Sequence, residues 1–190
     1  ARTVNDVKVS QDGKIAIISR EGASNRKNGI FILDVTNPYD VKVLAEYTKN
    51  LTGGVHNLFI DNEHAYVLGS GERYYILNIE DPSNPVEVGM FELGKEGQSI
   101  HDVWIEDGIA YSSNWKDGVY LVDVGNGIAG GSPSNPVAFA DYTYASGANH
   151  AAFPFKSKST GTFYVVLCDE IFPNGVDLTE PSITAGFCHF

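Results

Sequence analysis

The feature that most constrains the fold of this chain is a repeat of about 45 residues. One copy reads "IHDVWIEDGIAYSSN" at Ile100–Asn114 and continues to "VYLVDV", so an alternation of apolar and polar residues gives way to an apolar run. The interval from His56 to His101 is 45 positions, and the interval from His101 to His150 is 49. Alternation with a period of two is typical of β-strands, and recurrence at this interval indicates an array of similar structural units.

Each copy predicts four antiparallel strands. The Asp-Gly pairs at 12–13 and 107–108 suit tight hairpin turns, because both residue types tolerate positive φ. Pro82 and Pro85 cannot donate a ladder hydrogen bond, so they are expected in the connection before a fourth strand. Four strands in about 45 residues is the size of one blade of a β-propeller.

We therefore predict an all-β fold, a β-propeller of four-stranded antiparallel blades, with about three and a half blades present. The blades are expected at approximately 1–50, 51–95, 96–145 and 146–190, the last of them incomplete, forming one segment of a larger propeller. A parallel β-helix would have shorter coils, and a two-sheet sandwich would not need near-copies of itself.

The charge of the chain narrows the range of partners. The 190 residues include 24 Asp and Glu against 13 Lys and Arg, which gives a formal net charge of −11. This surface would repel a phosphate backbone, so nucleic acid is not expected as a partner. No apolar stretch approaches the roughly 20 residues that cross a bilayer, so the chain is not expected to span a membrane.

The blade motifs resemble those of the LVIVD-repeat propellers. The resemblance is carried by "HDV" or "HN" at the start of a blade, by "VYLVDV", "IFILDV" and "YYILNI", and by "DPSNPVEV" after them. It implies a propeller that is exported, extracellular, on the cell surface or periplasmic, with a leader that this sequence does not include. The first copy departs from the pattern, because Asn5 stands where the other copies have histidine.

The repeated histidines, His56, His101 and His150, are the candidate metal ligands. In a propeller the first strand of each blade lines the central channel, so equivalent histidines could converge there and bind copper, iron or zinc. The alternative is structural: a polar residue at this place can hydrogen-bond the neighbouring blade and hold the blades together. Asn5 favours this alternative, because Asn could do the same but is a poor ligand for such metals.

The end of the chain offers two further candidates. Asp169 and Glu170 open a long acidic connection that could hold calcium, although its spacing matches no EF-hand and a solvated acidic loop would explain it as well. Cys168 and Cys188 either form a hairpin disulfide or are two small buried residues.

Other motifs favour binding over catalysis. The sequence contains no GxSxG, P-loop, HExxH or CxxC pattern. Trp115, in the turn "NWKDG", is a candidate contact residue, because a turn offers little core in which to bury it.

The expected function is a non-catalytic scaffold that binds a protein or glycan partner. This scaffold could also be one part of a larger assembly. The alternative is a metal-dependent, oxidase-like propeller enzyme with the three histidines as ligands.

Overall fold

The computed structural model describes residues 3–23, 27–144, 148–170 and 188–189. These residues form 15 β-strands and, within the described ranges, no helix. None of them forms the long apolar helix that crossing a bilayer would require.

The strands form four sheets. The first sheet contains β1 (Val7–Val9), β2 (Ile15–Arg20), β3 (Gly29–Asp34) and β4 (Lys42–Tyr47). The second contains β5 (Val55–Asp61), β6 (His64–Gly69), β7 (Arg73–Asn78) and β8 (Val86–Phe91). The third contains β9 (Asp102–Glu106), β10 (Ile109–Ser113), β11 (Val119–Asp123) and β12 (Val137–Tyr142). The fourth contains β13 (Asn149–Lys156), β14 (Phe163–Asp169) and β15 (Cys188–His189).

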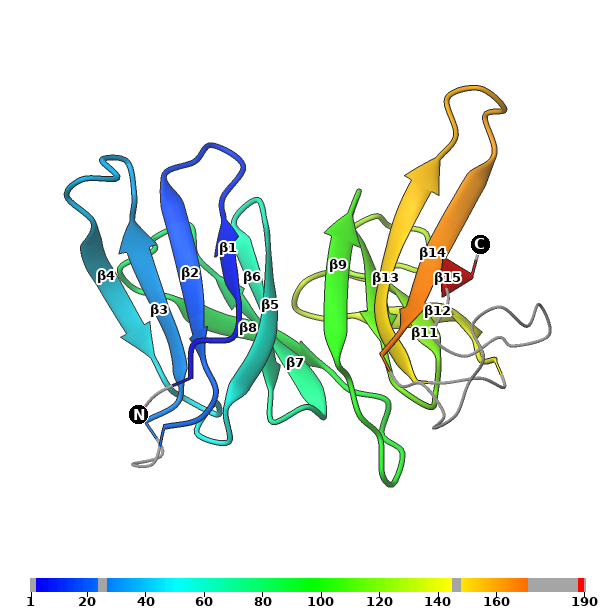
Figure 1. Ribbon diagram of the computed structural model, residues 1–190, viewed down its shortest axis with the longest axis horizontal. Helices are drawn as coiled ribbons and strands as arrows, with labels where there is room; N and C mark the ends of the chain where they lie inside the picture. Colours follow the sequence, from blue (N-terminus) through cyan, green and yellow to red (C-terminus); the bar gives the residue numbers. More distant parts are fainter. Residues whose placement is uncertain (1–2, 24–26, 145–147, 171–187, 190) are drawn as a thin grey trace, which may run out of the picture.

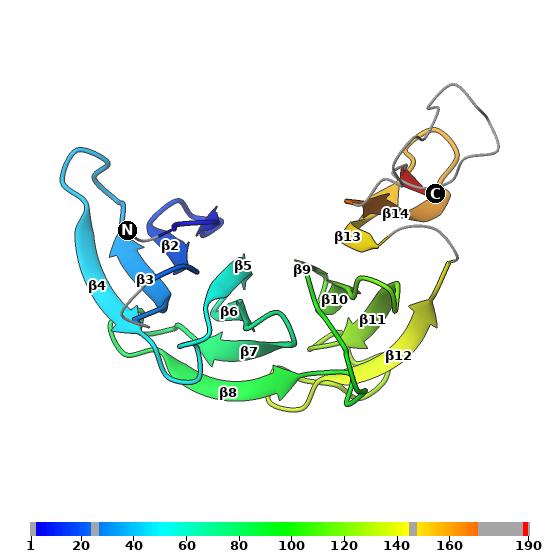
Figure 2. The ribbon, with the colours of Figure 1, turned by 60° about the horizontal axis from the view of Figure 1, so that its bottom comes forward.

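Each sheet is an antiparallel meander whose strands pair in sequence order. Figure 1 shows the sheets following one another from the N-terminus to the C-terminus. They form an arc, with β5, β9 and β13 along its inner side and β4, β8 and β12 along its outer side (Figure 2). This is the arrangement of blades in part of a β-propeller, so the predicted fold class is confirmed.

Alternating side chains of one strand pack against different neighbouring blades. In β6, Ala65 and Val67 belong to the cluster shared with the first sheet, whereas Tyr66 and Leu68 belong to the cluster shared with the third. Successive side chains of a strand point to opposite faces, so both faces of the second sheet are buried. This double burial explains why the strands are apolar on both faces.

The hairpin turns follow from local sequence. Asp107 and Gly108 connect β9 to β10, and their φ values are 51° and 71°. Two successive residues with positive φ match the right-handed twist of the flanking strands, and Asp-Gly is a preferred pair for such a turn. Asn62, with a φ of 49°, occupies the corresponding turn of the second sheet.

The outer strand of each complete sheet carries the same irregularity. The register between the third and fourth strands shifts at Ile32/Leu33, Ile76/Leu77 and Leu121/Val122, which are equivalent positions of the repeat. A bulge at this place increases local twist and bends the strand. The repeated bulge therefore belongs to the blade itself, and the alternation of residues does not reveal it.

Asp123 organises the long loop that follows β11. Its buried carboxylate accepts hydrogen bonds from the backbone amides of Gly125, Gly127, Ala129 and Gly131 at 3.0, 3.1, 2.7 and 3.0 Å. Burial by itself would raise the pKa of this carboxyl, but the four amides hold it well below its usual value. Asp34, at the same place in the first sheet, accepts one such bond, from Thr36.

Replacing Asp123 with Ala should therefore release the loop at 125–131. We expect faster amide hydrogen exchange in this loop and a lower Tm, because four backbone donors lose their acceptor together. The matched control is Asp34→Ala, which removes a single backbone acceptor and should have a smaller effect. Equal effects of the two substitutions on exchange and on Tm would contradict this account.

Candidate functional site

The structure brings the three repeated histidines together at one end of the inner strands. His56 lies on β5, His101 immediately precedes β9, and His150 lies on β13. The ring centroids of His56 and His101 are 4.6 Å apart, and those of His101 and His150 are 4.2 Å apart. Because each inner strand contacts the next, equal positions in consecutive blades become neighbours in space.

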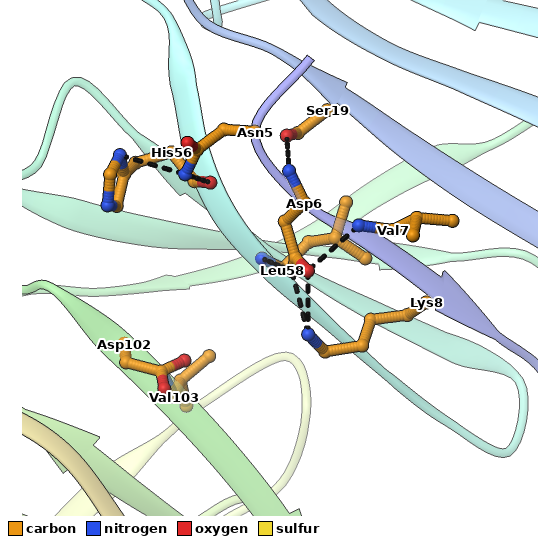
Figure 3. A network of polar contacts seen from close by, with 9 residues as sticks. All are labelled: Asn5, Asp6, Val7, Lys8, Ser19, His56, Leu58, Asp102 and Val103. Atoms are coloured by element: carbon orange, nitrogen blue, oxygen red, sulfur yellow. Dashed lines mark hydrogen bonds and ion pairs between the residues drawn. The ribbon is translucent and has the colours of Figure 1, made fainter.

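Asn5 performs the blade-to-blade role that its place in the repeat suggested. Its side-chain amide donates to the backbone carbonyl of His56 at 2.7 Å, so it links the first blade to the second (Figure 3). One residue further on, the Asp6 carboxylate pairs with Lys8 at 2.8 Å and accepts the amide of Leu58 at 3.1 Å. The first copy of the repeat therefore contributes blade contacts where the others contribute imidazoles.

The hydrogen bonds of His101 fix which of its ring nitrogens carries the proton, whereas those of His56 do not. His56 Nδ1 lies 2.8 Å from Glu21 Oε1, and His101 Nδ1 lies 3.2 Å from the carbonyl oxygen of His150. A carbonyl only accepts, so the proton of a neutral His101 ring belongs on Nδ1. His56 Nδ1 also lies 3.1 Å from the donor Nδ2 of Asn5, so its two contacts are compatible with a proton on either ring nitrogen. His101 Nε2 presents its unshared electron pair beside His56 Nε2, 3.1 Å away.

Glu170 adds a carboxylate to this cluster. Its Oε2 lies 3.5 Å from His101 Nε2 and 3.9 Å from His150 Nε2. Ligand atoms of these three residues all lie within 4.8 Å of one another, close enough to hold a metal ion. Asp169, its neighbour, instead accepts a hydrogen bond from the Tyr144 hydroxyl. The rest of the acidic connection that follows Glu170 lies outside the described residues, so the calcium loop stays a prediction.

A cavity of about 610 Å³ opens beside the cluster, and we refer to it as the mouth cavity. Four of its lining residues lie just beyond the end of the second strand of a blade. Three of them follow the last strand residue directly, and Trp115 lies two residues after it. These four are Glu21, Ser70, Trp115 and Glu170. Sequence reasoning missed Glu21 and Ser70 entirely. The signal that could have found them is the offset from the histidine position, which is 14 residues for both Ser70 and Trp115.

Trp115 lies on the wall of the mouth cavity rather than at an exposed loop tip. It is half-buried, and its ring meets that of His101 edge to face, with centroids 4.9 Å apart. Its φ of 48° is unusual for a bulky side chain, and strain of this kind gathers at functional sites. Two backbone hydrogen bonds with Asn149, at 3.2 and 3.0 Å, hold it in place.

Burial controls the charge of His101 and of its neighbour Asp102. Burial, followed by the charges of His150 and His56, lowers the pKa of His101 to about 4, so this ring is neutral at pH 7. Burial also raises the pKa of Asp102 to about 6. One oxygen of Asp102 accepts the amide of Val103 at 2.7 Å, so it caps the start of β9. His101 is thus held in the form that can donate an electron pair.

The backbone places Cys168 opposite Cys188 across β14 and β15, and Cys168 is disulfide-bonded. Of the two alternatives that the sequence left open, the structure contains the disulfide. It ties the strand that ends just before Glu170 to β15.

Comparisons with known proteins support the fold. No family model matches the chain. No curated protein matches it either. Among solved structures, a periplasmic gluconolactonase of Pseudomonas aeruginosa aligns with a TM-score of 0.64 and 12% identity, covering 88% of this chain and 47% of its own. An auxiliary nutrient binding protein of Bacteroides thetaiotaomicron aligns with a TM-score of 0.57 and 11% identity, covering 87% of this chain and 42% of its own. Both are β-propellers, and this chain spans less than half the length of either.

In metal-free protein, we expect the His101 ring to stay neutral from about pH 8 down to about pH 5. An unfolded chain would bind this proton near pH 6.5, so His101 costs the native state stability as the pH falls from 6.5 toward 4. Asp102 acts in the opposite sense, because its raised pKa makes its contribution to stability fall as the pH rises through about 4 to 6.

Because the two effects oppose each other, bulk stability would conceal both. NMR titration of the histidine rings, with a chelator present and with His101→Gln to assign the signal, measures the His101 pKa directly. A midpoint near 6.5 for this ring would contradict the neutral, buried state that the structure describes.

Proposed function

We propose that this chain forms part of an exported, LVIVD-type propeller that binds a small glycan or sugar acid in the mouth cavity. The observation that carries the proposal is the convergence of two corresponding regions of successive blades, the start of the inner strand and the end of the second strand, on this cavity. The first region supplies His56 and His101, and the second supplies Glu21, Ser70, Trp115 and Glu170.

The lining of the cavity suits a polyhydroxylated ligand. Its volume of about 610 Å³ falls within the range of small-molecule sites. The carboxylates of Glu21 and Glu170 can accept hydrogen bonds from hydroxyl groups, and the Ser70 hydroxyl can both donate and accept. Trp115 offers an apolar surface against which the C–H face of a sugar ring can pack. A concave site of this kind favours a small glycan over a flat protein surface.

The names of the two comparison structures agree with such a ligand and with export. One is a periplasmic gluconolactonase, and the other is a nutrient binding protein. At sequence identities of 12% and 11%, the structural similarity supports only the fold. The ligand class is therefore inferred from the residues that line the cavity.

A second candidate is a metal-dependent propeller enzyme that uses the same cavity. The observation that favours it is the set of imidazole nitrogens facing one another beside Glu170. Binding of a glycan and binding of a metal are separable properties, and each can be measured without the other.

Glycan binding is tested with a panel of hexoses, aldonic acids and aldonolactones, by calorimetry in the presence of a chelator. We expect at least one member of the panel to bind, and Trp115→Ala to weaken its binding about tenfold or more, because a buried aromatic anchor is worth more than ~1 kcal/mol. The matched control is Trp104→Ala, since Trp104 is 40% exposed on β9 and does not line the cavity.

Two results would contradict the proposal. The first is a wild-type protein that binds no member of the panel. The second is a loss of affinity that is the same for Trp104→Ala and Trp115→Ala, which would indicate a general effect on the fold rather than contact with the ligand.

A further inference from the structure

We propose that His101, His150 and Glu170 bind one divalent first-row transition-metal ion, Zn²⁺ or Fe²⁺, at the edge of the mouth cavity. This site goes beyond the proposed glycan binding and does not depend on it.

The donor atoms have separations close to those of metal ligands. Two ligand atoms at 2.0–2.2 Å from a tetrahedral ion lie about 3.4 Å apart. The Glu170 carboxylate oxygen lies 3.5 Å from His101 Nε2 and 3.9 Å from His150 Nε2. Small rotations of Glu170 and His150, whose side chains are 48% and 41% exposed, would bring these atoms to the ideal spacing. His101 is 9% exposed and provides the fixed point.

The orientation of His101 is set by a contact on its far side. Its Nδ1 donates to the backbone carbonyl of His150, which directs Nε2 toward Glu170. Metal-binding histidines usually donate their second N–H to a carbonyl or carboxylate in this way, which fixes the tautomer and raises the basicity of the ligand. His56 is also held at Nδ1, which lies 2.8 Å from Glu21 and 3.1 Å from the side-chain amide of Asn5, and its Nε2 is turned toward His101.

The contact between His56 and His101 is compatible with a cation beside it. When His56 carries its proton on Nδ1, two unshared pairs face each other at 3.1 Å and repel unless a positive charge lies beside or between them. A metal ion bound to His101 would accept the electron pair of this ring and present its positive charge to His56. A proton on His56 Nε2, with Asn5 donating to Nδ1, is the other arrangement that satisfies this geometry, and the metal-binding measurement separates the two.

The surrounding charges also favour a cation. Glu21 and Glu170 both line the mouth cavity, and no lysine or arginine is among its lining residues in the described part of the chain. Two carboxylate side chains without a lysine or arginine beside them favour the binding of a cation over that of an anion.

The donor set selects the class of metal. Two imidazoles and one carboxylate are typical of zinc sites and of non-haem iron sites that keep open positions for other ligands. Calcium and magnesium take mainly oxygen ligands, and only one of the three residues supplies oxygen. The open positions would face the mouth cavity, where Glu170 and His101 are both exposed to its volume.

A purely structural role for the histidines predicts a different result. If they only join blades, as Asn5 does, then removing His101 lowers stability and no stoichiometric metal binds. Glu170→Gln distinguishes the two roles best, because it preserves the shape of the side chain and removes only its charge. Glu170 is half exposed, so this substitution should leave the fold intact.

The first experiment is calorimetric titration of chelator-treated protein with Zn²⁺ and, under anaerobic conditions, with Fe²⁺. We expect one equivalent of either ion to bind, Glu170→Gln to weaken it about tenfold or more, and His101→Ala to abolish it. His64→Ala is the matched control, because His64 begins β6 and does not line the mouth cavity, and it should bind as the wild type does. Ca²⁺ and Mg²⁺ should not compete.

The second experiment identifies the ligands by spectroscopy, with Cu²⁺ as the probe. Electron paramagnetic resonance should show coupling to at least two nitrogen nuclei in the wild type and to fewer in folded His150→Ala. Circular dichroism and Tm confirm that each variant is folded. The proposal is overturned by an absence of stoichiometric Zn²⁺ and Fe²⁺ binding, or by binding that His101→Ala and Glu170→Gln leave unchanged. Neither result would alter the glycan titration, which is made with a chelator present.

Discussion

The burial of both faces of each sheet is the constraint on which the rest of the structure depends. A single four-stranded sheet with apolar residues on both faces exposes one of them unless a second sheet covers it. In β6, Ala65 and Val67 require one neighbouring blade, whereas Tyr66 and Leu68 require another. Face-to-face stacking of twisted sheets turns each blade slightly against the last, and the result is an arc with the first strands inside (Figure 2).

The arc converts a repeat in sequence into a cluster in space. Residues at one position of the repeat lie far apart along the chain, but they meet at one end of the inner strands. His56, His101 and His150 meet in this way, and a second set that includes Glu21 and Glu170 surrounds them. The apolar contacts between blades thus determine the positions of the polar groups around the mouth cavity. None of these polar groups is itself part of the apolar clusters.

The sequence predicts the parts of the structure that depend on local pattern. Alternation reveals the strands, Asp107-Gly108 reveals a turn, and the repeated histidine reveals the inner strand. Glu21 and Ser70 escape prediction because their residue types differ and because hairpins of different length shift their offset from the histidine position. The orientation of a ring depends on atoms of other blades, such as the carbonyl that His101 contacts, and no local pattern contains that information.

Asn5 shows how one repeat position can serve two purposes. Where the position holds Asn5, the side chain contacts both the backbone carbonyl and the ring of His56 in the next blade. Where it holds His101, Nδ1 makes the equivalent contact with the carbonyl of His150, and Nε2 remains available. An imidazole can therefore join two blades and still present an electron pair to the mouth cavity. The structural and the metal-binding interpretations are consequently not exclusive, because each uses a different nitrogen of the same ring.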